Sequence, residues 1–326
     1  MQLSRRRFTL AAGAAGAAVI AMPSWSLAQD NYPNRPIRLV VPLAPGGGGD
    51  LTARQVAPLL SERLGGTVVV ENRPGAGGSL GTDIVLKSPP DGYTLAWLSS
   101  SYTCNAALHK LPFDPIEDLG PISLFKRESL VLVGHPTKAG RNLAEVLARA
   151  KANPGTVTYG SSGIGGITHL STEDLANIAG VKLNHIAYKG TGPALQDVVA
   201  GNIELMMSSI APVIPMVESG RVIGLGIADA RARALPNVPS FAEAGLPGFK
   251  SGLWHAMAGP KGMPANVVAR LNGAINDIMK VSAMVERFDS EGSVAVGGPP
   301  EVLMKAVRDD IAQWKTIVAR ASIKAE

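Results

Sequence analysis

Short apolar strand-like runs alternate along this chain with longer stretches of helical periodicity, and this alternation restricts its fold more than any other feature. The runs at 37–41 and 130–133 contain almost only Val, Leu and Ile, and helical patterns lie between such runs. Strands that are buried on both faces have unbroken apolar sequences of this kind. The pattern therefore predicts an α/β fold with doubly wound sheets flanked by helices.

The same periodicity predicts the individual elements. Pro58 is unfavourable inside the first predicted helix, because proline cannot donate a backbone hydrogen bond there. The expected strands are Ile37–Val41, Thr67–Glu71, Thr94–Leu98, Leu130–Gly134, Thr156–Gly160, Leu183–Tyr188, Ile203–Ser208, Val222–Ala228 and Leu253–Ala258. The expected helices are Asp50–Leu64, Leu80–Lys87, Asn142–Ala152, Ile167–Ala179, Pro193–Ala200, Ala265–Lys280 and Pro300–Ala321.

Glycine-rich loops follow two of the expected strands and run directly into helices. In sheets of this class ligands bind beyond the carboxyl ends of the strands, where helix N-termini favour anions. Glycine also lets the backbone approach a ligand closely, although a flexible turn would have the same composition. The predicted contacts from these loops are Ala44, Pro45, Gly46, Gly47, Gly48 and Asp50, and Ser161, Ser162, Gly163, Gly165 and His169.

Two further loops offer hydroxyl groups, which donate to a carboxylate without adding a fixed charge. They contribute Tyr188, Lys189 and Gly190, and Ser99, Ser100 and Ser101, to the predicted site. Lys189 could supply a positive charge, although an ordinary surface lysine is the favoured interpretation. His169 is equally consistent with a structural residue that orients the Ser161–Ser162 loop.

The first 28 residues have the pattern of an export signal. Arg5, Arg6 and Arg7 precede a short apolar run and then small residues at Ser26 and Ala28, which predicts a twin-arginine signal peptide cleaved after Ala28. The run is shorter than the roughly 20 apolar residues that span a bilayer, which disfavours the alternative of a retained anchor. We therefore expect a periplasmic protein.

The charge of the chain argues against nucleic acid as a partner. The net charge is +5, and removing the three signal arginines from 31 basic residues leaves 28 against 26 acidic ones, or +2. A near-neutral chain without a basic cluster lacks the electrostatic footprint of a nucleic-acid-binding protein.

Cys104 is the only cysteine and forms no intramolecular disulfide, so we expect a buried structural thiol.

Enzyme and metal motifs do not fit this sequence. Asp50 follows the four glycines where a P-loop needs Gly-Lys-Ser/Thr, and Ile164 replaces the last glycine of a nucleophile elbow. The loop Gly75–Gly81 is a poor dinucleotide fingerprint. Histidines 109, 135, 169, 185 and 255 form no metal-binding pattern. We therefore expect no cofactor, no metal and no catalysis.

Many ordered segments resemble the periplasmic substrate-binding proteins of tripartite tricarboxylate transporters, also called the Bug family. The resemblance covers nearly all of the chain after the signal. It rests on Tyr32–Ile37, Ala44–Gly47 with Asp50 and Arg54, Val70–Gly78, Asp91–Thr94, Tyr159–Gly165, His169–Leu170, Tyr188–Gly190, Gly201, Leu235–Pro239 and Glu243–Gly245.

The resemblance implies a type II periplasmic-binding-protein fold with two lobes, here 30–127 plus 229–326 and 128–228. It implies a receptor that closes around a small organic acid, held largely by main-chain groups and hydroxyls, and delivers it to membrane transporter subunits. A monomer is expected. Ser208 is also a predicted ligand contact, and it lies in a serine-rich segment that departs from the family pattern, as does Gly166, so the identity of the solute stays open.

Two other functions remain open at this stage. A secreted serine hydrolase would use Ser161 or Ser162 with His169 or His185 as base. A receptor of this type would also suit a signalling partner in place of a transporter.

Overall fold

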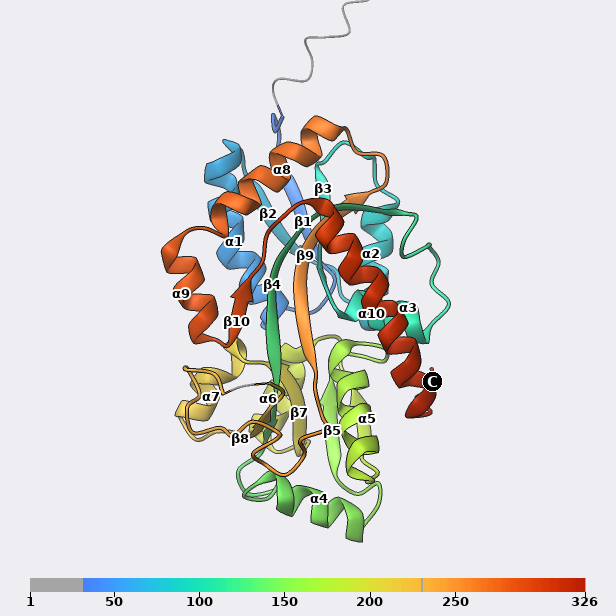
Figure 1. The fold of residues 1–326 in the computed structure, drawn as a ribbon, viewed down its shortest axis with the longest axis vertical. Coiled ribbons are helices and arrows are strands. Elements are labelled where there is room, and N and C mark those ends of the chain that lie inside the picture. Colours follow the sequence, from blue (N-terminus) through green and yellow to red (C-terminus); the bar gives the residue numbers. More distant parts are fainter. Residues whose placement is uncertain (1–31, 230, 326) are drawn as a thin grey trace, which may run out of the picture.

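The computed structural model describes residues 32–229 and 231–325, in two halves joined by long central strands (Figure 1). The strands are β1 (Ile37–Val41), β2 (Val68–Asn72), β3 (Thr94–Ser99), β4 (Leu119–Gly134), β5 (Thr158–Ser161), β6 (Asn184–Ala187), β7 (Leu205–Ser209), β8 (Ile223–Ile227), β9 (Gly252–Pro260) and β10 (Ser293–Ala295). The expected signal peptide lies outside the described residues.

Helices flank the sheet in both halves (Figure 1), which confirms the predicted α/β class. They are α1 (Gly48–Leu64), α2 (Ser79–Leu86), α3 (Ser101–Leu108), α4 (Leu143–Ala152), α5 (Ile167–Ala179), α6 (Thr191–Ala200), α7 (Ile214–Glu218), α8 (Ala265–Ile278), α9 (Ser282–Ser290) and α10 (Pro300–Arg320), with short 3₁₀ turns η1 (Ala76–Gly78) and η2 (Ala211–Val213). Pro58 lies exposed inside α1, and the helix continues through it.

The sheet is mixed, with the strand order β2-β1-β3-β9-β4-β7-β5-β6, and β10 and β8 also pair with β4. Strands β1, β2 and β3 are parallel in one half, and β5, β6 and β7 are parallel in the other. Between them β4 and β9 run antiparallel to their neighbours. The apolar run at 130–133 therefore reflects burial on both faces and not parallel pairing.

Strand β4 is much longer than the predicted strand Leu130–Gly134. The prediction was too short because only the second half of β4 has an apolar sequence. Its first part, Leu119–Ser129, pairs with β9, and its last part, Leu130–Gly134, pairs with β7 and β8. Gly120, Pro121 and the charged residues near 127 conceal the first part from a periodicity search. The strand thus passes from one half of the molecule into the other.

Each half has its own hydrophobic core. Trp97 and Phe125 pack under α1 and α8 in the upper half of Figure 1, and Tyr159 and Leu175 pack beside β7 in the lower half. Phe241 and Phe249 join the lower core although they precede β9. Within the described residues, none of the helices combines the length and apolar character that a membrane span requires.

Candidate functional site

Four helices begin at one place between the two halves of the molecule. Helices α1 and α3 belong to the upper half, and α5 and α6 belong to the lower half. Their first residues surround a small space, the central cavity. Its walls are Val41, Pro42, Leu43, Gly48, Gly49, Trp97, Ser99, Ser101, Ser162, Ile167, Thr168, Thr191, Ser209, Leu253 and His255.

The electrostatics of the central cavity favour an anion. The lining contains no Lys, Arg, Asp or Glu among the described residues. The free N–H groups at a helix N-terminus carry about half a positive charge, and each terminus stabilises a nearby anion by ~0.3–1 kcal/mol. Hydroxyl groups on both sides of the cavity add donors: Ser101 and Ser162 each accept one hydrogen bond and keep their own proton for a solute.

The glycines of the two loops allow the halves to approach each other. A Cβ on Gly192 would lie within 3.0 Å of the Pro45 carbonyl oxygen, and one on Gly48 within 3.0 Å of Ser209. The Ala44 N–H also donates to the Lys189 carbonyl across the interface, at 2.9 Å. Glycine therefore permits contact between the halves, where the sequence had suggested contact with a ligand.

Asp50 shapes its loop and does not face the cavity. Its carboxylate, 4% exposed, accepts hydrogen bonds from the Gly46 N–H, from Arg54 Nε and from Asn72 Nδ2, each at 3.0 Å. These donors hold the four-glycine turn against β2. Asp50 is thus a positioning residue for the start of α1.

Ser100 and Ser101 have different tasks. The Ser100 hydroxyl accepts from the Trp254 N–H at 3.0 Å and ties the start of α3 to β9. The Ser101 hydroxyl accepts from the Ile167 N–H at 3.1 Å and so joins the start of α3 to the start of α5. Ser101 thereby links the two halves at the wall of the cavity.

Ser161 and Ser162 at the end of β5 also have different roles, one in fixing the turn and the other in lining the cavity. Ser162 lines the cavity and contacts Thr168 through two hydrogen bonds of 2.8 and 3.0 Å. Ser161 is fully buried outside the cavity lining, with its Oγ 2.6 Å from His185 Nε2. It also accepts from the Gly163 N–H at 3.1 Å, which fixes the turn.

His169 orients the second glycine loop. Its Nδ1 accepts a hydrogen bond from the Gly165 N–H at 3.3 Å, and its ring stacks on His185 with 4.1 Å between ring centroids. Burial, with the neighbouring His185 and His109, lowers the pKa of His169 to about 3. The ring is therefore neutral at ordinary pH, and its position agrees with the structural alternative.

A buried charged cluster underlies the cavity where β4 crosses between the halves. Glu128 accepts from Lys126 Nζ at 2.7 Å and from Ser293 at 3.2 Å, and lies 2.8 Å from His255 Nε2. Trp97 Nε1 donates to His255 Nδ1 at 3.2 Å, so Nε2 carries the proton and the ring is neutral. Burial correspondingly lowers the pKa of His255.

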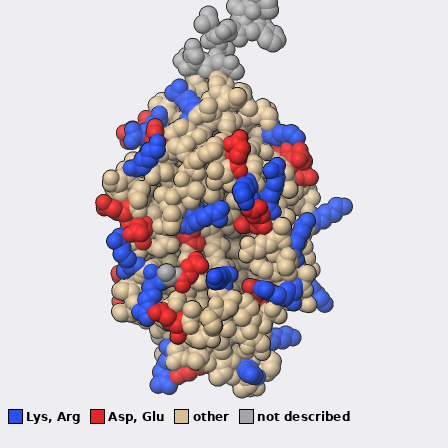
Figure 2. Space-filling model, in the orientation of Figure 1, with Lys and Arg blue, Asp and Glu red and all other residues tan. Residues whose placement is uncertain are grey.

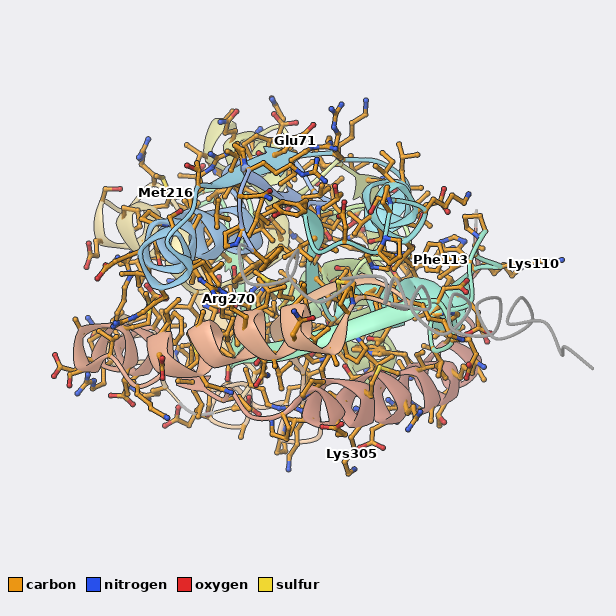
Figure 3. All side chains as sticks on the ribbon, turned by 90° about the horizontal axis from the view of Figure 1, so that it is seen from above. Glu71, Lys110, Phe113, Met216, Arg270 and Lys305 are labelled. Atoms are coloured by element: carbon orange, nitrogen blue, oxygen red, sulfur yellow. The ribbon has the colours of Figure 1, made fainter. Side chains whose placement is uncertain are left out.

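A wider space, the outer opening, lies between the halves on the solvent side of the loops. Gly163, Tyr188 and Lys189 line it, together with Lys110. Lys189 is exposed, and Figure 3 shows Lys110 projecting away from the body of the protein. The positive charges of this opening are therefore solvated.

A third space lies on the reverse face of β9 and has a different character. It is bounded by β10 and α10, and it carries Arg127 and Lys250 beside Asp229 and Asp310. Figure 2 shows both signs of charge interspersed over this side of the molecule. Because successive side chains of a strand point to opposite faces, Trp254 faces this space whereas His255 faces the central cavity.

The structure brings together only part of the predicted site. Gly48, Ser99, Ser101 and Ser162 line the central cavity, and Gly163, Tyr188 and Lys189 line the outer opening. The remaining candidates line neither space: Ala44, Pro45, Gly46, Gly47, Asp50, Ser100, Ser161, Gly165, His169, Gly190 and Ser208. No group of three or more possible metal-ligating side chains occurs within 32–229 and 231–325.

Several cavity residues were not predicted from the sequence. Ser209 lines the cavity in place of its neighbour Ser208, since the two point to opposite faces of β7. Thr168 immediately precedes the predicted His169 and Thr191 immediately follows the predicted Gly190, so the loops themselves could have indicated them. Trp97 and His255 come from paired strands far apart in the sequence, for which the sequence carries no such signal.

Known proteins are similar to this chain in both sequence and fold. The family model described as tripartite tricarboxylate transporter family receptor matches residues 52–323. Protein BugT of Bordetella pertussis is 37% identical over 299 residues, which are 90% of this chain and 92% of BugT.

Two solved structures are similar along most of their length. The periplasmic binding protein BugD is 32% identical, with a TM-score of 0.86 and coverage of 90% of this chain and 100% of BugD. MatC from Rhodopseudomonas palustris, solved with bound malate, is 30% identical, with a TM-score of 0.83 and coverage of 88% of this chain and 100% of MatC.

Proposed function

Because this chain belongs to the tripartite tricarboxylate transporter receptor family, we propose that it captures a small carboxylate-bearing solute in the central cavity for delivery to a membrane transporter. The family consists of binding receptors, and the chain is not an enzyme. The convergence of four helix N-termini on one uncharged cavity is the observation that carries the proposal.

The supporting argument is electrostatic. A carboxylate in the central cavity would meet the starts of α1 and α3 from one half and of α5 and α6 from the other. At ~0.3–1 kcal/mol for each helix terminus, together with hydroxyl donors from Ser101 and Ser162, the site favours an anion without burying a cation beside it. The relative MatC, solved with malate, is consistent with this chemistry.

We propose that the solute drives closure of two lobes about β4 and β9. Each lobe supplies part of the binding surface, so a bound solute favours the closed arrangement over the open one. We place the first crossing near Arg127. Since Phe241 and Phe249 pack in the lower core, we place the return crossing near Gly252, later than the expected Asp229.

The proposed location is the periplasm, with a twin-arginine signal cleaved after Ala28. The pattern of residues 5–28 and the periplasmic relative BugD support it. We further propose that the protein acts as a monomer whose closed form contacts the membrane subunits. The alternative is a signalling partner. A pull-down with the transporter subunits would distinguish a transporter partner from a signalling partner.

The hydrolase alternative gains little support from the site. Ser161 approaches His185 but is fully buried outside the cavity. Ser162 reaches the cavity but hydrogen-bonds to Thr168, and His169 is engaged with Gly165. A nucleophile must share one accessible space with its base.

Closure is tested with a matched pair of glycine variants. In Gly192→Ala the new methyl group would meet the Pro45 carbonyl of the opposite half, whereas in Gly273→Ala on α8 it meets nothing within 4 Å. We expect Gly192→Ala to weaken solute binding at least tenfold in calorimetry and to abolish solute-dependent compaction in X-ray scattering, with Gly273→Ala unchanged. Full compaction and affinity in Gly192→Ala would refute the closure mechanism.

A further inference from the structure

A recess lies on the reverse face of the strands that join the two halves, opposite the central cavity. This hinge recess has a volume of about 330 Å³, which lies within the ~300–1,000 Å³ range of small-molecule sites. Arg127 on β4 pairs with Trp254 on β9 and with Val294 on β10, so these three side chains share one face of the sheet. Helix α10 contributes Asp310 and Gln313 to the other wall. The hinge recess therefore has room for a small molecule between the sheet and α10.

Four charged side chains line the hinge recess, and none of them forms an ion pair in the described chain. Arg127 and Lys250 are exposed cations, and Asp229 and Asp310 are the anions. Asp229 accepts a hydrogen bond from the Ser129 hydroxyl at 2.6 Å, which is a neutral donor. The two cations are therefore available to an anionic group of a ligand.

Asp310 is the anion of the hinge recess that most requires a partner. Its carboxylate accepts hydrogen bonds from Trp254 Nε1 at 2.6 Å and from the Thr103 hydroxyl at 3.4 Å, both of them neutral donors. Burial raises the pKa of Asp310 above its ordinary 3.8, although Trp254 and the charge of Arg127 act in the opposite direction. Arg127 thus acts on Asp310 from beyond ion-pair distance. A cation that enters the gap between them would stabilise this half-buried carboxylate.

The wall beside these charges is partly apolar. Val294 is 67% exposed, more than any other large apolar side chain in the described chain, and Leu253 lies in the same lining. An aliphatic group that covers Val294 would remove both surfaces from water, which favours binding. The hinge recess thus combines two cations, two anions and an apolar patch.

The hinge recess also touches both halves of the molecule. Arg127 and Gly252 lie at the two proposed strand crossings, and both line it. Helix α10 packs Ile311 in the core of the upper half and Trp314 in the core of the lower half. Since the halves already touch around the central cavity, the recess has here the shape of the closed arrangement. A molecule that fits this shape favours closure over opening.

We propose that the hinge recess is a second ligand site, distinct from the central cavity, for a small aliphatic zwitterion such as an amino acid. The carboxylate of the zwitterion pairs with Arg127 and Lys250, its ammonium group pairs with Asp310, and its aliphatic group covers Val294. Occupation of the recess favours the closed arrangement and thereby tightens the binding of solute in the central cavity. This second effect rests on the proposed function, whereas the site itself does not.

The test uses L-leucine and two analogues. One is 4-methylpentanoate, which lacks only the ammonium group, and the other is 3-methylbutylamine, which lacks only the carboxylate. The indole N–H signals of Trp254 and Trp97 report by NMR on the hinge recess and on the central cavity, respectively, in purified protein freed of carried-over solute. We expect leucine to shift the Trp254 signal with at least tenfold higher affinity than either analogue. No shift of this signal by leucine, or an equal affinity of either analogue, would overturn the proposal.

Two variants remove one charge from each side of the proposed site. Arg127→Met and Asp310→Asn are each expected to weaken leucine binding at least fivefold. Asp309→Asn on the exposed face of α10 is the matched control and should leave leucine binding unchanged. Arg127 is exposed and makes no side-chain hydrogen bond in the described chain, so its replacement should not disturb folding. Unchanged leucine affinity in Arg127→Met would place leucine elsewhere and overturn the proposal.

X-ray scattering tests the coupling to closure without a second solute. Leucine is expected to compact the solute-free protein, and this compaction should be lost in Arg127→Met. Leucine that binds without compaction would overturn the coupling and leave the second site standing. Titration with malate, followed at Trp97, then separates the two proposals: if neither malate nor another small carboxylate binds the central cavity, the proposed function fails while leucine binding at Trp254 still supports the second site.

Discussion

The buried cluster around Glu128 allows a sharp prediction of stability. The side chains of Glu128 and Lys126 are 0% and 1% exposed, and their charged atoms are 2.7 Å apart. Burial by itself would raise the pKa of Glu128, but Lys126 and His255 outweigh it and hold this pKa down to about 2, from an ordinary 4.5. At ~1.4 kcal/mol for each tenfold change in proton affinity, this corresponds to ~3 kcal/mol of stabilisation.

Glu128→Gln removes the charge but keeps the shape of the side chain. Lys126 is then left buried, with Glu291 at 3.9 Å as its remaining carboxylate in the described chain. Removing one partner of a buried ion pair costs about 3–5 kcal/mol, because the other charge stays desolvated. We therefore expect the free energy of unfolding to fall by ~3 kcal/mol, in agreement with the value from the pKa.

Urea unfolding followed by circular dichroism measures this effect. The slope of the unfolding free energy against urea concentration should be the same in Glu128→Gln as in the original protein. Asp309→Asn is the matched control, since its ion pair with Lys305 is exposed on α10 and its loss should cost less than ~0.5 kcal/mol. Figure 3 shows Lys305 pointing outward from that helix. A loss below ~1 kcal/mol in Glu128→Gln would refute the reasoning, because the cluster would then be hydrated or flexible.

Three further predictions follow from single contacts. Burial lowers the pKa of His255 and of His169 below the ordinary 6.5, so the unfolded chain binds more protons and the melting temperature should fall as the pH drops below 6.5; a flat profile between pH 6.5 and 5 would contradict this. Burial raises the pKa of the fully buried Cys104 thiol, so a thiol reagent should label it only after unfolding, as mass spectrometry would show. Ser101→Ala removes the acceptor of the buried Ile167 N–H across the two halves together with the hydroxyl proposed to donate to the solute, and a loss of ~1 kcal/mol or more should weaken solute binding at least fivefold in calorimetry; unchanged affinity would show that neither hydrogen bond contributes to binding.

Much of the fold could be predicted from local patterns. The strand Ile37–Val41 and the helix Ile167–Ala179 have the predicted bounds, because apolar periodicity and the flanking glycines mark them clearly. The short helix Ser101–Leu108 was missed, since its buried face contains Thr103 and Asn105 and lacks a regular apolar stripe. The first part of β4 was missed because its charged residues are buried as a cluster.

The structure brings the predicted loops together, whereas only some of their predicted residues line the cavity. The loops that follow strands and enter helices meet between the two halves. The sequence does not show which side of a loop faces the cavity. Asp50 and His169 turn toward their own loops, and Ser209 takes the place of Ser208.

The sequence by itself determined the α/β class, the glycine-rich helix starts and the family, because these depend on local order along the chain. The tertiary structure decided that four helix N-termini meet around one uncharged cavity. It also decided that Glu128 and Lys126 neutralise each other at the crossing strand, where the neutral His255 donates a hydrogen bond to Glu128. These features depend on the directions of side chains from distant segments, which are fixed only when the strands pair and the two halves pack together.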